Sequence, residues 1–130
     1  MKIKTIKATL AIAAVAISGG VATTTASAAG LTPTQVSIEA QSGGDFFGYV
    51  SSSDEVNCES GRKVTLFKML GSTPDRSVDR KIGSDTASPN GPDSMWSTGN
   101  TGQRKGKFYA RVGKTSLCAG DVSPVVKAQP

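Results

Sequence analysis

Residues 107–112 read KFYARV, and residues 62–67 read RKVTLF. In both segments every second side chain is apolar and its neighbours are mostly polar or aromatic. The apolar members are Val64, Leu66, Phe108, Ala110 and Val112. Because successive side chains of a strand point to opposite faces, this alternation predicts two strands, each with one buried face.

Weaker alternation marks five further segments, and turn-forming residues separate them. The five segments are 36–40, 46–51, 77–82, 95–97 and 121–127. The clusters of Gly, Pro, Asn and Ser between strands lie at 41–44, 71–74, 88–92 and 99–102. No stretch of about a dozen residues after position 28 has the 3.6-residue period of a helix. Seven short strands predict an all-β chain, a single antiparallel β-sandwich, with a small barrel as the alternative.

The first 28 residues have the pattern of a secretory signal peptide. Lys2, Lys4 and Lys7 precede an apolar run at 8–17, and ASAA at 26–29 offers a cleavage site after Ala28. The run is shorter than the ~20 residues of a membrane span, although an uncleaved anchor is the alternative. We therefore expect a cleaved signal at 1–28, a loose N-terminus at 29–33 and one domain at 34–130. No stable membrane insertion is expected after cleavage.

Removal of the signal changes the charge of the chain. The full chain of 130 residues carries a formal charge of +5, and the part after residue 28 keeps 12 basic against 10 acidic side chains. A net charge of +2 in an exported chain argues against nucleic-acid binding. The expected location is secreted or extracellular, or periplasmic if the organism has an outer membrane.

Cys58 and Cys118 are the only two cysteines. Export implies an oxidising compartment, where paired cysteines normally form a disulfide. Free thiols for metal or redox chemistry are a weaker alternative, because the chain has no histidine. Cys58 precedes the 62–67 strand and Cys118 follows the 108–112 strand. If these strands are antiparallel neighbours, the bond joins two loops at one end of the sandwich.

The order of several short motifs resembles a known kind of module. They are GYVS at 48–51, CESGRKVTLF at 58–67, IGSDT at 82–86, MW at 95–96, GKFYARV at 106–112, and SPVV at 123–126 after Cys118. Together they resemble small secreted bacterial β-sandwiches of the carboxypeptidase regulatory-like (transthyretin-like) and B-type collagen-adhesin repeat kinds. The resemblance implies a seven-stranded, Ig-like or transthyretin-like sandwich and an extracellular setting, and it implies no catalytic residues. The turn from Asp85 to Trp96 is longer than in those modules.

Catalytic and metal-binding motifs are weak or absent in this sequence. Without histidine, Ser-His-Asp and Cys-His arrangements are excluded. The S-x-x-K match at 60–63 lacks its partner motifs and is interpreted as coincidence. Gly113-Lys114-Thr115 resembles the end of a phosphate loop but lacks the required glycine at position 108. Scattered acids do not match a calcium loop. We predict no catalytic residue, no metal ligand and no cofactor.

Two features are candidates for binding. Arg104, Lys105 and Lys107 form a basic patch beside Tyr109, which could attract a phosphate, an acidic polysaccharide or an anionic surface. A solvated turn is the favoured interpretation of that patch. Trp96, the only tryptophan, could stack on a ligand, although a place in the core is favoured.

These observations predict a secreted, monomeric, non-catalytic binding or structural module. Its expected partner is an extracellular protein, a polysaccharide or a cell-envelope surface. The alternative is a small secreted effector, such as a hydrolase inhibitor that acts through its loops, with the 85–96 segment as the candidate. An enzyme is the third hypothesis.

Overall fold

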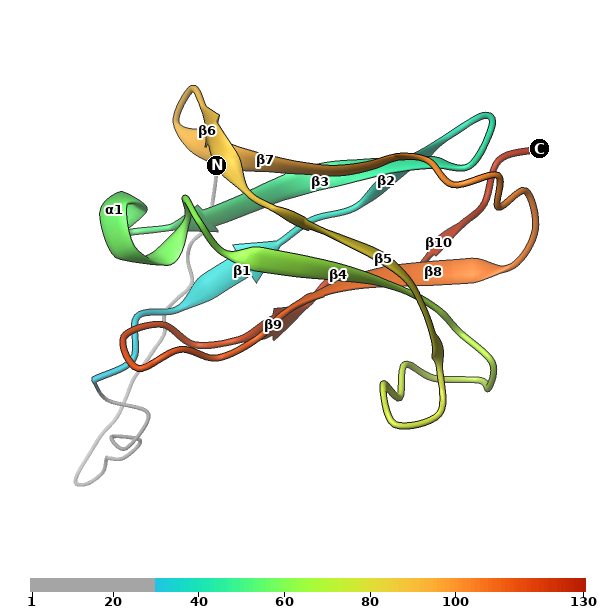
Figure 1. Ribbon diagram of the computed structural model, residues 1–130. Coiled ribbons are helices and arrows are strands. Elements are labelled where there is room, and N and C mark those ends of the chain that lie inside the picture. The colour runs from blue at the N-terminus through green and yellow to red at the C-terminus, as the bar shows by residue number, and fades with distance from the viewer. Residues whose placement is uncertain (1–29) are drawn as a thin grey trace. The chain divides into compact units, whose positions relative to one another are not determined.

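Two antiparallel β-sheets face each other across one apolar core (Figure 1). The computed structural model describes residues 30–130, so the expected signal peptide lies outside the described residues. In spatial order, the first sheet consists of β1 (Thr34–Val36), β3 (Asp45–Ser52), β7 (Asp93–Asn100) and β6 (Ser88–Asn90), with β2 (Glu39–Gln41) also on β3. The second consists of β10 (Val126–Lys127), β8 (Lys107–Val112), β4 (Lys63–Lys68) and β5 (Arg80–Thr86), with β9 (Asp121–Val122) also on β8.

The structure confirms a mostly β, two-sheet fold, but residues 30–130 contain ten strands where seven were predicted. The 36–40 segment becomes β1 and β2, and the 121–127 segment becomes β9 and β10. At both interruptions a serine hydroxyl accepts a hydrogen bond from a backbone amide of the neighbouring strand. The Ser37 hydroxyl accepts from the Tyr49 amide, and the Ser123 hydroxyl accepts from the Ala110 amide. The side chain thus takes the place of a backbone acceptor, which breaks the ladder into two short strands.

The third extra strand, β6, was predicted as a turn because it reads Ser-Pro-Asn. Pro89 lacks an amide hydrogen, but β6 is an edge strand with one neighbour, where proline is tolerated. At Ala87 the chain passes from β5 in the second sheet to β6 in the first. The helical turn α1 (Glu55–Cys58), capped by the Asp54 side chain, was not predicted either.

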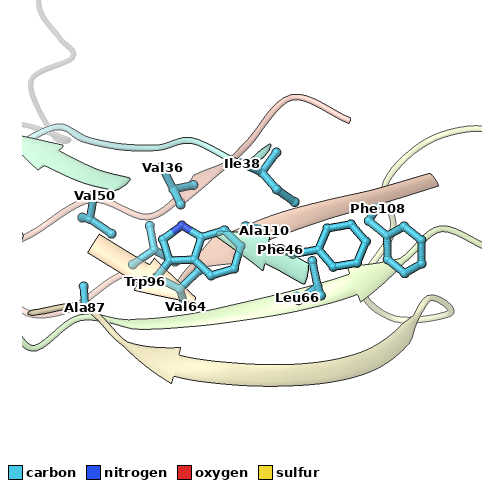
Figure 2. Packing of buried hydrophobic residues seen from close by; sticks show 11 residues of the cluster. Val36, Ile38, Phe46, Val50, Val64, Leu66, Ala87, Trp96, Phe108 and Ala110 are labelled. Carbon is cyan, nitrogen blue, oxygen red and sulfur yellow. The ribbon is translucent and has the colours of Figure 1, made fainter. Parts of the chain in front are cut away.

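The core follows the alternation that predicted the strands. Val64 and Leu66 of β4 and the apolar residues of β8 are buried, as Figure 2 shows. Trp96 is fully buried, and its indole nitrogen donates a hydrogen bond to the Ser37 carbonyl at 3.0 Å. Gly48 on β3 makes room for this contact, because a Cβ there would lie 2.0 Å from the same carbonyl oxygen.

The start of the domain is hydrogen-bonded to the loop that follows β8. Thr32 donates a backbone hydrogen bond to Leu117 and accepts one from Ala119. The part of the expected loose N-terminus that contains Thr32 is therefore tied to the 117–119 segment. Within residues 30–130 no helix is long and apolar enough to cross a membrane.

Candidate anion-binding cleft

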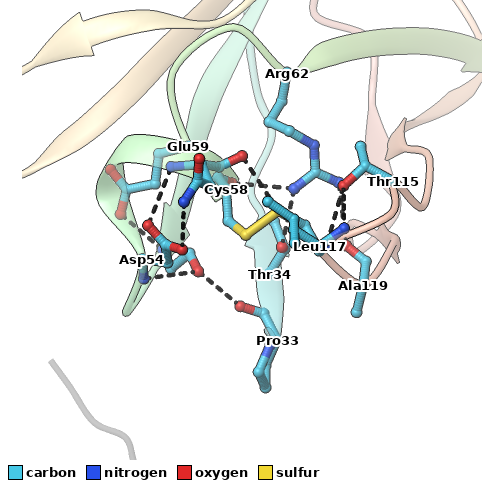
Figure 3. The surroundings of a disulfide bond; sticks show 12 residues. Pro33, Thr34, Asp54, Cys58, Glu59, Arg62, Thr115, Leu117 and Ala119 are labelled. Atoms are coloured by element: carbon cyan, nitrogen blue, oxygen red, sulfur yellow. Dashed lines mark hydrogen bonds between the residues drawn. A yellow bond between two sulfur atoms is a disulfide. The ribbon is translucent and has the colours of Figure 1, made fainter. Parts of the chain in front are cut away.

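The predicted disulfide is present between Cys58 and Cys118, whose Cα atoms lie 5.5 Å apart (Figure 3). It joins the last residue of α1 to the loop that follows β8. Because β4 and β8 are antiparallel neighbours, both cysteines fall at the same end of the sandwich, as expected. Both are fully buried, and no described cysteine is free.

Arg62 lies beside the disulfide and holds the surrounding loops together. Its side chain is only 5% exposed. One terminal nitrogen donates to the Thr34 hydroxyl and the Cys58 carbonyl, both at 3.1 Å. The other donates to the carbonyls of Gly113 at 2.7 Å and Ala119 at 3.1 Å. Figure 3 shows the guanidinium between these segments. None of these four acceptors carries a charge, so they satisfy the donors of Arg62 without neutralising its positive charge.

A cleft of about 430 Å³ opens next to this arginine, on the outer face of the second sheet. We call it the basic cleft, and its lining residues are Gly61, Arg62, Lys63, Thr65, Arg111, Gly113, Lys114 and Thr115. Thr65 of β4 pairs with Arg111 of β8, so alternation also places Lys63 and Gly113 on this face. Their common face points away from the core, which the intervening residues Val64 and Val112 enter.

Gly113 helps to hollow the cleft. It follows Arg111 by two residues, and a Cβ at position 113 would lie 3.4 Å from a terminal nitrogen of Arg111. The missing side chain therefore leaves space beside the Arg111 guanidinium. The Gly113 carbonyl is the acceptor closest to Arg62, which fixes this part of the loop against the buried arginine.

The charge of the cleft is all of one sign. Four cationic side chains line it, and none of its described lining residues is acidic. Burial lowers the pKa of Arg62, but a guanidinium remains protonated in proteins. Nearby acids serve other groups: Glu59 accepts the Ser52 amide and Asp121 accepts the Val36 amide. Like charges gathered in a concave site favour an anion, because they repel one another until it binds.

The predicted basic patch is not part of this cleft. Arg104, Lys105 and Lys107 are exposed in the segment before β8 and at its first residue. Lys107 and Arg111 are four residues apart on β8, which separates them by roughly 13 Å along the strand. The patch and the cleft therefore lie at different ends of β8.

The two aromatic residues considered for binding, Trp96 and Tyr109, are both buried. Trp96 has no exposed area, so it is the core residue that the favoured interpretation described. Tyr109 is 1% exposed, although it lies on the outer face of β8. Phe67 stacks on the Tyr109 ring, and the Tyr109 hydroxyl donates a hydrogen bond to Asp79 at 2.6 Å. Burial and this hydrogen bond raise the pKa of Tyr109.

The long 85–96 turn, the candidate inhibitory loop, is mostly regular structure. Its residues form the end of β5, all of β6 and the start of β7, and Asn90 pairs directly with Asp93. Only Gly91 and Pro92 remain as the turn, and Gly91 has the positive φ of 68° that such a turn requires. The segment is a tight hairpin and presents no extended loop.

In the part of the chain that the structure describes, no cluster of three or more Cys, Asp or Glu side chains could hold a metal ion. Asp79, one of the acids considered for calcium, accepts three hydrogen bonds, from the Tyr109 hydroxyl and the amides of Leu70 and Asp75. These bonds, that of Tyr109 first, lower the pKa of Asp79. The carboxylate is thus used to pin the loop between β4 and β5.

Comparison with known proteins adds no family. A scan against protein-family models finds no match, and a search of characterised proteins finds no similar sequence. The resemblance to carboxypeptidase regulatory-like and collagen-adhesin modules therefore stays a prediction.

The basic cleft was not predicted from the sequence, although two of its lysines belong to short motifs noted there. Lys63 belongs to the S-x-x-K match and Lys114 to the Gly-Lys-Thr match, which fit neither a catalytic site nor a nucleotide-binding loop. Their cations meet because β4 and β8 are adjacent. The available signal was the set of cations at the polar positions of two strands already predicted as neighbours.

Proposed function

We propose that this chain is a secreted, monomeric, non-catalytic module that binds an anionic polymer, an acidic polysaccharide of the cell envelope or surroundings, through the basic cleft. The observation that carries the proposal is a cleft with four cations and no acid, built on a disulfide-fixed end of the sandwich. The resemblance to extracellular modules and the signal-peptide pattern support a secreted location.

The fixed part of the site favours binding over a solvated surface. Arg62 is buried and held by four hydrogen bonds, so its charge stays in place without an entropy cost on binding. Lys63 and Lys114 are exposed and can adapt to a flexible ligand. Thr65 and Thr115 add hydroxyl groups that can bond sugar or acidic oxygens.

Binding of the mature chain to dextran sulfate, with uncharged dextran as reference, tests the proposal. We expect binding to dextran sulfate alone, and weaker binding as NaCl rises from 50 to 300 mM, because salt screens exposed charges. The Lys63→Gln/Arg111→Gln variant should bind at least about tenfold more weakly. That loss equals about 1.4 kcal/mol, near the lower end for a hydrogen bond to a charged group.

The Arg104→Gln/Lys105→Gln variant is the matched control, because it removes the same charge outside the cleft. Its affinity for dextran sulfate should fall by less than about threefold. Equal losses of affinity in the two variants would show that net charge alone drives binding and would overturn the role of the cleft. No binding to dextran sulfate at 50 mM NaCl would overturn the proposed function itself. Unchanged thermal unfolding of both variants shows that the fold is intact.

A further inference from the structure

The edge strand β5 has a free side within the described part of the sandwich. β5 pairs with β4 only, and β6 covers β7 only from Asp93 to Met95. In Figure 1, β5 lies near β6 and β7 at one end and diverges from β7 towards its other end. The two strands are joined near one end by the Asp85 carboxylate, which accepts the Ser97 amide at 2.8 Å. Beyond that bond neither of these described strands is paired with another strand on this side.

A second cleft, of about 350 Å³, lies where the two strands separate. We call it the β5 edge cleft, and its lining residues are Arg80, Lys81, Ile82, Gly83, Ser84, Thr98, Thr101 and Gln103. Five of these are consecutive residues of β5, so the strand's backbone forms one wall. On the other wall the hydroxyls of Thr98 and Thr101 already donate to the carbonyls of Phe46 and Gly44. The Gln103 side chain can both donate to and accept from a chain lying between the walls.

Backbone groups of β5 point into this space. Ala87 exchanges hydrogen bonds with Gly61 and Arg62 beside β4. In an antiparallel ladder the bonded residues alternate, so the N–H and C=O groups of Ser84, which lines the cleft, point away from β4. At Ile82 the register with β4 shifts by one residue, so the regular alternation ends there. Such unpaired groups on an edge are a template for an added strand.

The charge at this edge selects the sequence of that strand. Arg80 and Lys81 are exposed and adjacent, and no described lining residue is acidic. The single acid of β5, Asp85, is engaged with Ser97. A second copy of β5 would therefore meet two cations without an available carboxylate, which disfavours pairing between copies.

We propose that the β5 edge cleft accepts an extended peptide segment that carries acidic side chains and adds to the second sheet along 80–84. Backbone bonds to β5 supply affinity, and Arg80 and Lys81 select acidic residues. Five strand residues span roughly 17 Å, so a peptide of about seven residues covers the site. This site is separate from the basic cleft and does not depend on polysaccharide binding.

Fluorescence anisotropy tests the proposal with a labelled seven-residue peptide of Glu, Thr and Val. Two of its glutamates are adjacent, so that both faces of the added strand carry an acid. We expect saturable binding, weakened at least about tenfold when lysines replace the glutamates. A peptide with the same side chains but N-methyl groups on alternate backbone nitrogens should also lose at least about tenfold, because it cannot pair as a strand. The Arg80→Gln/Lys81→Gln variant should bind the glutamate peptide more weakly, while Arg104→Gln/Lys105→Gln should not.

Three results would overturn the proposal. Equal binding of the N-methylated peptide would show attraction to charge without strand addition. Failure of the glutamate peptide to bind at millimolar concentration would exclude this partner class. A dimer in sedimentation velocity that the Arg80→Gln/Lys81→Gln variant alters would assign the edge to a second copy. A monomer that binds only the unmodified acidic peptide supports the proposal.

Discussion

Replacement of Arg62 by methionine is the sharpest test of how the basic cleft is held. Arg62→Met keeps the apolar stem but removes the donors of four hydrogen bonds, between 2.7 and 3.1 Å long. Hydrogen bonds to a charged group contribute about 1.5–3 kcal/mol each, but burial of a cation costs several kcal/mol. The two effects leave an expected net loss of about 3 kcal/mol in the free energy of unfolding.

Urea unfolding of the mature chain, oxidised, at pH 7 measures that loss. It should appear as a lower midpoint with an unchanged slope. In a domain of this size it corresponds to a Tm lower by about 12–24 °C. Arg62→Lys should lose at least half as much free energy of unfolding. Its single ammonium nitrogen cannot reach both pairs of acceptors that the two terminal nitrogens of Arg62 bond. Arg104→Met on the exposed segment should change stability by less than about 0.5 kcal/mol. A similarly small change in Arg62→Met would refute the role of Arg62 in holding the surrounding loops together.

Three further predictions concern the fold. Gly48→Ala should destabilise the domain by about 2–4 kcal/mol in urea unfolding, since its Cβ would displace the Trp96 contact; a neutral result would contradict that packing. Reduction of the disulfide should lower stability by about 4 kcal/mol, measured with and without reductant, whereas equal midpoints would exclude this role. Asp79 has a lowered pKa, so its stabilisation is present above its unfolded value of 3.8 and is lost as pH falls through the folded value. The stability difference between wild type and Tyr109→Phe should thus be full at pH 6 and shrink as the pH falls below 3.8. A difference independent of pH would contradict the bond to Asp79.

Period-two alternation predicted the central strands because it reflects a purely local rule. The polar and apolar positions of β4 and β8 fall on opposite faces, and the position of the disulfide followed from placing these strands side by side. Strand interruptions escaped prediction because they depend on Ser37 and Ser123. Their hydroxyls accept hydrogen bonds from backbone amides of the neighbouring strands in place of a backbone carbonyl. Nothing in the local sequence distinguishes these serines from others.

The candidate site was harder to predict because it depends on contacts between distant segments. Tyr109 occupies an outward position of β8, so alternation alone places it at the surface. The loop that ends at Asp79 folds back on it and buries it, thirty residues away in sequence. Arg62 likewise reads as an exposed residue at a strand start, yet its acceptors come from Thr34 and from the loop after β8. Pairing of β4 with β8 then turns separate cations into one cleft.

Chemical-shift mapping tests the central claim, anion binding in the basic cleft, most directly. The ¹⁵N-labelled mature chain would be titrated with a short dextran sulfate oligomer, and with uncharged dextran as reference. We predict that the amides that shift with dextran sulfate cluster at 61–65 and 111–115, with little change at 104–107. Shifts centred on 104–107, or spread evenly over all exposed cations, would contradict the assignment of anion binding to the cleft.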